Sequence, residues 1–193
     1  MSTLITDELS GFRDNNHLIR VPNNITLYEP ERVLQTVWKQ YDLHNTYNSY
    51  NDNNSRDISG LNLTNVTLKK ATSKVFLSWY VFYECHHDIT FQAKRNGSVV
   101  GYNTEVGNVR YSGLGSAEYE HSHDQSSTPT YKHMCYVDTP GSVGPHTYSI
   151  GTRSSTGSNY DIRINRAWSN FTDSYEAGVS WAILQEVAVW LQQ

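Results

Sequence analysis

The chain has 193 residues, which is enough for one domain or for one domain with an extended arm. Only 18% of its residues are charged and 37% are hydrophobic, but it carries 14 tyrosines and 5 tryptophans, so the composition excludes a disordered chain and favours strands joined by tight turns. The net charge of −4 is spread without a basic stripe, and no run of about 18 apolar residues occurs, which argues against nucleic-acid binding and membrane insertion.

Residues 1–30 are expected to form an N-terminal arm, and residues 31–193 the main domain. The opening segment MSTLITDELSGF lacks the basic and apolar regions of a secretory signal peptide, so we expect synthesis and folding in a cytoplasm. Residues 18–27 surround a turn at Pro22–Asn24 and predict a short hairpin or two edge pieces, because proline cannot donate to a ladder.

The clearest strand in the sequence is the segment SKVFLSWYVFYE, which begins at Ser73. It follows an expected strand over residues 32–41 and an expected polar surface loop over residues 42–59. Its apolar residues alternate with period two, so one face carries Val75, Leu77, Trp79, Val81 and Tyr83 and the other Phe76, Tyr80 and Phe82. We expect one face to contact the core and the other to contact another subunit.

Shorter strands are expected along the rest of the chain. The segment DITFQAKRNGSVVGYN predicts a hairpin with its turn at Asn96 and Gly97. Residues 107–130 show no regular pattern, whereas residues 131–137, 147–153 and 160–168 read as strands. In the terminal segment GVSWAILQEVAVWLQQ a helix is conceivable, but the period-two spacing of its apolar residues favours a strand. Eight to ten strands without a helical crossover indicate an all-β, antiparallel sandwich, jelly roll or barrel.

Three segments resemble virion surface modules of marine and cyanobacterial tailed phages. They are LIRVPNNITLYEPERVLQTVWKQY, SGLNLTNVTLKKATSKVFLSWYVFYE, and YSIGTRSSTGSNYDIRINRAW followed by GVSWAILQEV. Together they cover most of residues 18–187 in the family's order. The resemblance implies a jelly roll of the tumour-necrosis-factor or complement-head type that assembles as a homotrimer. Residues 107–130 have no counterpart in that pattern, and AVWLQQ extends beyond its last strand.

The resemblance implies a structural role in the virion without catalysis or cofactors. In one interpretation the trimer is a capsid decoration or cement protein, whose residues 1–30 contact the major capsid protein or another virion protein. In the other it is a tail-fibre head that recognises a host surface glycan or protein. The chain is short and has no repetitive shaft, which favours decoration. Six residues are expected in the trimer interface or core, namely Trp79, Val81, Tyr83, Trp181, Ile183 and Val187.

The sequence offers few residues for catalysis or metal binding. Among its Cys and His residues, His121 and His123 would share a face of an extended segment and are the better metal pair, but solvated loop histidines are the preferred interpretation. Cys85 and Cys135 could pair, although a cytoplasm favours free thiols. No nucleophile elbow or phosphate loop occurs, and we expect no enzymatic activity. The candidate recognition residues are Tyr47, Tyr50, Tyr111, Tyr119 and Trp168.

Overall fold

A computed structural model describes residues 32–49, 55–85, 89–101, 113–117, 129–154, 158–168 and 176–188. These residues form twelve strands and one turn of 3-10 helix. The bounds are β1 Val33–Tyr41, β2 Asn45–Ser49, β3 Arg56–Asp57, η1 Ser59–Leu61, β4 Leu63–Val66, β5 Lys74–Glu84, β6 Ile89–Arg95, β7 Ser98–Val99, β8 Gly115–Ser116, β9 Thr130–Asp138, β10 His146–Ser154, β11 Tyr160–Ile164 and β12 Ser180–Val187. The expected arm over residues 1–30, with its hairpin, lies outside the described residues.

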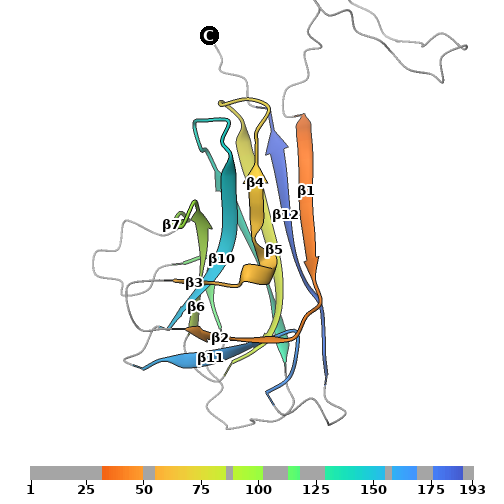
Figure 1. The fold of residues 1–193 in the computed structure, drawn as a ribbon, viewed down its shortest axis with the longest axis vertical. Coiled ribbons are helices and arrows are strands. Elements are labelled where there is room, and N and C mark those ends of the chain that lie inside the picture. The colour runs from red at the N-terminus through yellow and green to blue at the C-terminus, as the bar shows by residue number, and fades with distance from the viewer. Residues whose placement is uncertain are drawn as a thin grey trace, which may run out of the picture. The chain divides into compact units, whose positions relative to one another are not determined.

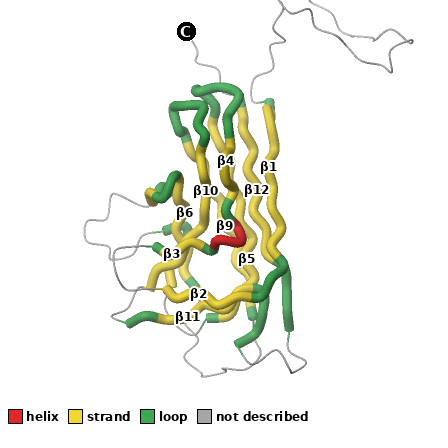
Figure 2. The backbone as a smooth tube through the Cα atoms, viewed as in Figure 1, coloured by secondary structure: helices red, strands yellow, loops and turns green. Residues whose placement is uncertain are grey.

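The strands form two antiparallel sheets in a sandwich-like arrangement (Figure 1). Sheet A has the order β1-β12-β5-β11-β2, with β9 paired to the other edge of β5. Sheet B has the order β3-β10-β6-β7, with β4 paired to β10 and β8 paired to β6. Figure 2 shows how fully strands account for the described chain, with η1 as a single helical turn between β3 and β4. The expectation of an all-β, antiparallel fold is therefore confirmed.

Strand β5 lies in the middle of sheet A and is paired along both edges. On one edge it pairs with β9 from Val75 to Tyr83. On the other it pairs with β12 from Lys74 to Tyr80, and its last two residues pair with β11. With neighbours on both sides, the register of β5 fixes which of its side chains point into the sandwich, because a slip by one residue would exchange the two faces.

The core lies between the sheets and forms one hydrophobic cluster. Sheet A contributes Val75, Leu77, Trp79, Val81 and Tyr83 from β5, and sheet B contributes Phe91 and Ala93 from β6 and Tyr148 and Ile150 from β10. The rings of Tyr83 and Phe91 meet edge to face with their centroids 5.3 Å apart, which joins the two layers directly. Each fully buried large side chain in such a cluster contributes roughly 1.5–3 kcal/mol.

The hairpin predicted at Asn96 and Gly97 is confirmed. β6 and β7 flank these two residues, whose φ angles are 51° and 83°. Positive φ at both central positions is the geometry of a type I′ turn, which Asn-Gly adopts more readily than other pairs. Asn96 also accepts a hydrogen bond through Oδ1 from the backbone N–H of Thr147 (2.8 Å), which ties the turn to the start of β10.

The other predicted strands are also present, at slightly different bounds. The segments predicted over residues 32–41, 131–137 and 147–153 correspond to β1, β9 and β10. The terminal segment is the strand β12, as its period-two spacing predicted, and the helical alternative is wrong. Twelve strands occur in the described residues where eight to ten were expected, and the excess comes from β3, β7 and β8, which have two residues each.

The prediction of a surface loop over residues 42–59 is wrong in part. β2 and β3 both lie in this segment. Strand β2 pairs with β11, so that Ser49 lies opposite Tyr160. A partner this distant in sequence leaves no local sign in an Asn- and Tyr-rich segment, and backbone hydrogen bonds to β11 need no apolar alternation in β2. Strand β8 likewise lies inside residues 107–130, for which no regular structure was predicted.

One carboxylate, that of Glu186, is fully buried in sheet A and holds the β4–β5 connection against β12. It accepts hydrogen bonds from the backbone N–H groups of Lys69 and Lys70, from Ser73 Oγ (2.7 Å) and from Gln35 Nε2 (2.6 Å). Burial by itself raises the pKa of the Glu186 carboxyl, but these donors outweigh it, and the pKa lies below the ordinary value of 4.5.

We predict that Glu186→Gln lowers the free energy of unfolding at pH 7 by about 2 kcal/mol. The glutamine amide keeps one acceptor oxygen, but its NH₂ group is a donor and would face the N–H and O–H donors that now surround the carboxylate. Since the folded-state pKa is lowered, the carboxylate stabilises the fold at pH values above 4.5, and this contribution is lost as the pH falls through the lower folded pKa. Urea unfolding of both proteins at pH 7 and at pH 3–4 measures this difference. An equal difference at both pH values would contradict the prediction.

Candidate interaction surface

The outer face of sheet A is the largest concentration of exposed apolar side chains in the described part of the chain. In β5 the odd-numbered residues up to Tyr83 are buried and the even-numbered residues up to Phe82 are at least partly exposed. Trp79, Val81 and Tyr83, assigned from sequence to the interface or core, therefore lie in the core. Phe76, Ser78, Tyr80 and Phe82 point to the outer side.

Strand β12 places its large apolar side chains on the same outer side. Ala182, Leu184 and Glu186 are buried under the sheet, whereas Trp181, Ile183 and Val187 are partly exposed. The six residues expected in the interface or core are thus divided evenly between the two faces of sheet A. The division follows from strand geometry, because neighbouring residues in a strand point to opposite sides.

Strands β9 and β1 extend this surface on both sides. Trp38 on β1 is 68% exposed, Tyr131 and Val137 on β9 are 59% and 43% exposed, and Phe76 between them is 45% exposed. We call this surface the aromatic face and define it as Trp38, Phe76, Tyr80, Phe82, Tyr131, His133, Val137, Trp181, Ile183 and Val187. The sequence analysis did not select Trp38, Tyr131 or Val137; the cross-strand register alone brings them beside the residues of β5 and β12.

Stacked rings order the middle of the aromatic face. The ring of Tyr80 on β5 stacks on Tyr131 of β9, with centroids 4.9 Å apart, and on Trp181 of β12, with centroids 5.4 Å apart and planes within 7°. Each such pair contributes about 0.5–1.5 kcal/mol beyond the burial of its area. The stack therefore holds three large side chains in one arrangement across three strands, so the middle of the aromatic face is ordered within a single chain.

The side of sheet B that points away from the core is polar and largely buried. The residues of β6 and β10 that point away from the core are Thr90, Gln92, Lys94, Thr147, Ser149, Gly151 and Arg153. Lys94 Nζ lies 2.6 Å from Asp57 Oδ1 and donates to the carbonyl oxygen of Ser55 (3.1 Å). The described outer side of these two strands carries no large apolar side chain. In the described residues, the outer side of β6 and β10 is therefore polar and largely buried, whereas the outer side of sheet A exposes large apolar side chains.

A small polar cluster lies within the aromatic face. Ser78 Oγ is 2.7 Å from His133 Nε2, and Cys135 Sγ is 3.6 Å from the same nitrogen. A serine hydrolase would also need a carboxylate holding the other ring nitrogen of the histidine, and the described residues provide no such contact to His133. Cys135 is exposed, Cys85 is buried, and the two form no disulfide. Whether they pair was left open by the sequence.

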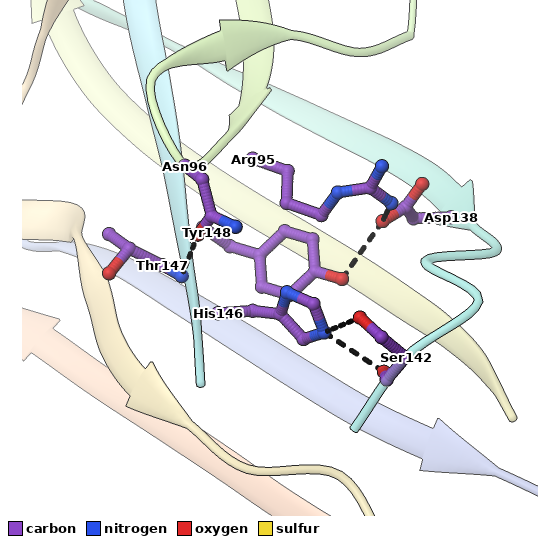
Figure 3. Close-up of polar contacts among 7 residues, drawn as sticks. All are labelled: Arg95, Asn96, Asp138, Ser142, His146, Thr147 and Tyr148. Atoms are coloured by element: carbon purple, nitrogen blue, oxygen red, sulfur yellow. Dashed lines mark hydrogen bonds and ion pairs between the residues drawn. The ribbon is translucent and has the colours of Figure 1, made fainter. Parts of the chain in front are cut away.

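A second polar group is buried at the end of the sandwich where β10 begins (Figure 3). Asp138 Oδ2 accepts from Arg95 Nη1 (2.6 Å) and from the Tyr148 hydroxyl (2.9 Å), and His146 Nε2 contacts the Ser142 carbonyl oxygen (3.0 Å). Burial, together with Asp138, raises the pKa of the Tyr148 hydroxyl, so the phenol remains a donor. These hydrogen bonds tie the end of β9 to β6 and to β10.

The candidate recognition residues are not brought together by the part of the fold that is described. Tyr47 packs against the core, and its hydroxyl lies 3.3 Å from Ser59 Oγ. Trp168 lies on the other side of the β2–β11 pair, where the guanidinium of Arg163 covers its ring at 4.5 Å. Tyr50, Tyr111 and Tyr119, together with the metal candidates His121 and His123, lie outside the described residues.

The chain matches no family model and no curated protein sequence. Within the residues described here, no group of three or more His, Cys, Asp or Glu side chains could hold a metal ion, and none of the helical structure is long and apolar enough to span a bilayer.

The two faces of sheet A predict effects of different size on stability for two tryptophan substitutions. Trp79→Ala removes a fully buried ring and should lower the free energy of unfolding by about 3–5 kcal/mol. Trp38→Ala removes an exposed ring and should change the stability of a single chain by less than about 0.5 kcal/mol. Urea unfolding at a low, fixed protein concentration compares the two variants. A large loss for Trp38→Ala in a monomeric chain would contradict its placement on the outer face.

Proposed function

We propose that the protein is a non-enzymatic structural component of a bacteriophage virion, a homotrimeric capsid decoration protein that assembles through the aromatic face. The observation that carries the proposal is the ordered, exposed aromatic surface on the outer side of sheet A. The assignment to a virion and to a trimer is drawn from the sequence resemblance. The physical argument for self-association is independent of it.

The strand order supports a jelly-roll topology. The four main strands of sheet A follow the order β1-β12-β5-β9, and those of sheet B the order β4-β10-β6-β7. Along the chain, the strands β4, β5, β6, β9, β10 and β12 alternate between the two layers, because β4, β6 and β10 lie in sheet B whereas β5, β9 and β12 lie in sheet A. The first and last strands described, β1 and β12, are neighbours. Two sheets connected in this way are typical of the double Greek key of a jelly roll.

The chemistry of the aromatic face supports a second copy of the chain as its partner. A contiguous exposed surface with two tryptophans, two tyrosines and two phenylalanines is unusual on a monomer and typical of a contact surface. Identical chains all carry this surface, so a symmetric homo-oligomer can cover it in every copy. The rings are already stacked in one arrangement, which lowers the entropic cost of association.

The proposal assigns a docking role to the N-terminal residues. In a decoration protein, residues 1–30 would contact the major capsid protein or another virion protein, while the trimer stays at the virion surface. No cofactor, nucleic acid or membrane enters the proposal. In the alternative, a tail-fibre head, the same trimer would instead present Tyr- and Asn-rich loops to a host surface glycan or protein.

Charges introduced into the aromatic face should dissociate the trimer. Phe76 and Val137 are opposite each other on β5 and β9, and both are exposed. In Phe76→Glu/Val137→Glu, two unpaired carboxylates per chain would be buried on assembly, a cost of several kcal/mol per ion. Light scattering should give three times the 22.1 kDa chain mass for the original protein and 22.1 kDa for the variant, with an unchanged circular dichroism spectrum.

Ser98→Glu is the matched control, because it adds charge to an exposed position on β7 of sheet B. The control should remain trimeric. A monomeric original protein at micromolar concentration, or a double variant that stays trimeric, would contradict assembly through the aromatic face.

The location of the protein in the particle separates the two virion roles. We predict that cryo-electron microscopy of intact virions with a label on the C-terminus of the protein shows density over the whole capsid. Label confined to the tail would contradict decoration and support the receptor-binding head.

A further inference from the structure

The polar cluster in the aromatic face has the geometry of a partial metal site. His133 and Cys135 are two residues apart on β9, so both side chains point outward, and both are exposed. Ser78 is directly opposite Cys135 on β5. The three polar atoms lie within 4 Å of one another, since Cys135 Sγ is 3.9 Å from Ser78 Oγ and 3.6 Å from His133 Nε2.

The separation between the sulfur and the nitrogen matches the spacing of two ligand atoms on one tetrahedral ion. Zinc binds thiolate sulfur at about 2.3 Å and imidazole nitrogen at about 2.0–2.1 Å, and a tetrahedral angle between these two bonds places the two ligand atoms about 3.6 Å apart. The distance between Cys135 Sγ and His133 Nε2 is 3.6 Å. The two ligand atoms therefore already have the spacing that one tetrahedral ion requires, without movement of the backbone.

We propose that His133 and Cys135 supply two ligands of a site for zinc or a similar thiolate- and imidazole-binding transition metal. The remaining coordination positions face away from the sheet, toward the surface that is covered in the proposed trimer. Water fills these positions in a separate chain, and side chains of a neighbouring copy replace water on assembly. Only this last step rests on the proposed function.

Metal binding changes the protonation and the contacts of the cluster in a defined way. Cys135 binds as the thiolate and releases its proton to solvent. His133 binds through the lone pair of Nε2, so the 2.7 Å contact of this nitrogen with the Ser78 hydroxyl must be given up. The ring of Trp181, whose centroid is 5.8 Å from that of His133, stays beside the imidazole and limits its rotation.

Cobalt(II) titration of the full-length protein in a metal-free, reducing buffer tests the inference. Bound cobalt should produce a thiolate-to-metal charge-transfer band in the near ultraviolet, which requires a coordinated cysteine. We expect His133→Gln and Cys135→Ser each to weaken cobalt binding roughly 100-fold. Loss of a residue that only hydrogen-bonds to a metal ligand already weakens metal binding about 10–100-fold, and the upper end of that range is expected for loss of a ligand itself. Ser78→Ala should bind cobalt at least as tightly as the original chain, because it frees the Nε2 lone pair.

His44→Gln removes an exposed histidine elsewhere and is the matched control, expected to leave binding unchanged. A charge-transfer band that persists in Cys135→Ser, or the absence of any band in a folded protein, would overturn the inference. Light scattering on the same samples keeps the two proposals separate. A monomer that shows the band supports the metal site and contradicts the trimer. A trimer without the band supports the trimer and contradicts the metal site.

Discussion

Pairing of β5 along both edges is the constraint on which the rest of sheet A depends. With β9 on one side and β12 on the other, the register of the central strand has no freedom, and each of its side chains is assigned to one face. A slip by one residue would move Trp79 out of the core and Tyr80 into it, at the cost of most of the core contacts. The core and the aromatic face are thus two consequences of the same hydrogen-bonding pattern.

This arrangement has an energetic consequence on each side of the sheet. On the inner side, burial in the sandwich stabilises the chain by itself. On the outer side, the stack of Tyr131, Tyr80 and Trp181 leaves a large apolar area in contact with water. Covering this area would be favourable, because it removes apolar surface from water. In the proposed assembly, neighbouring copies of the chain would cover this area.

The buried and the exposed polar groups differ in what surrounds them. Buried carboxylates are surrounded by donors: Glu186 accepts from two backbone N–H groups and two side chains, and Asp138 from Arg95 and Tyr148. Such satisfied groups stabilise particular loops and strand ends. His133 and Cys135, in contrast, are exposed in the middle of an apolar surface, and their polar contacts are with each other and with Ser78. Both side chains are exposed on the outer side of the sheet.

The sequence by itself determined the all-β class, the positions of the long strands and the Asn96–Gly97 hairpin, because period-two alternation and turn chemistry are local properties of the chain. It also separated the two faces of β5 correctly. It did not reveal β2, β3 or β8, whose pairing partners are distant in sequence and which need no alternation of their own. Only the tertiary structure decided which face of β12 is covered, and it placed Leu184 and Glu186 inside and Trp181 and Ile183 outside. It also brought Trp38, Phe76 and Val137 onto one surface, and Ser78 beside His133, because cross-strand register is set by long-range packing that no local pattern encodes.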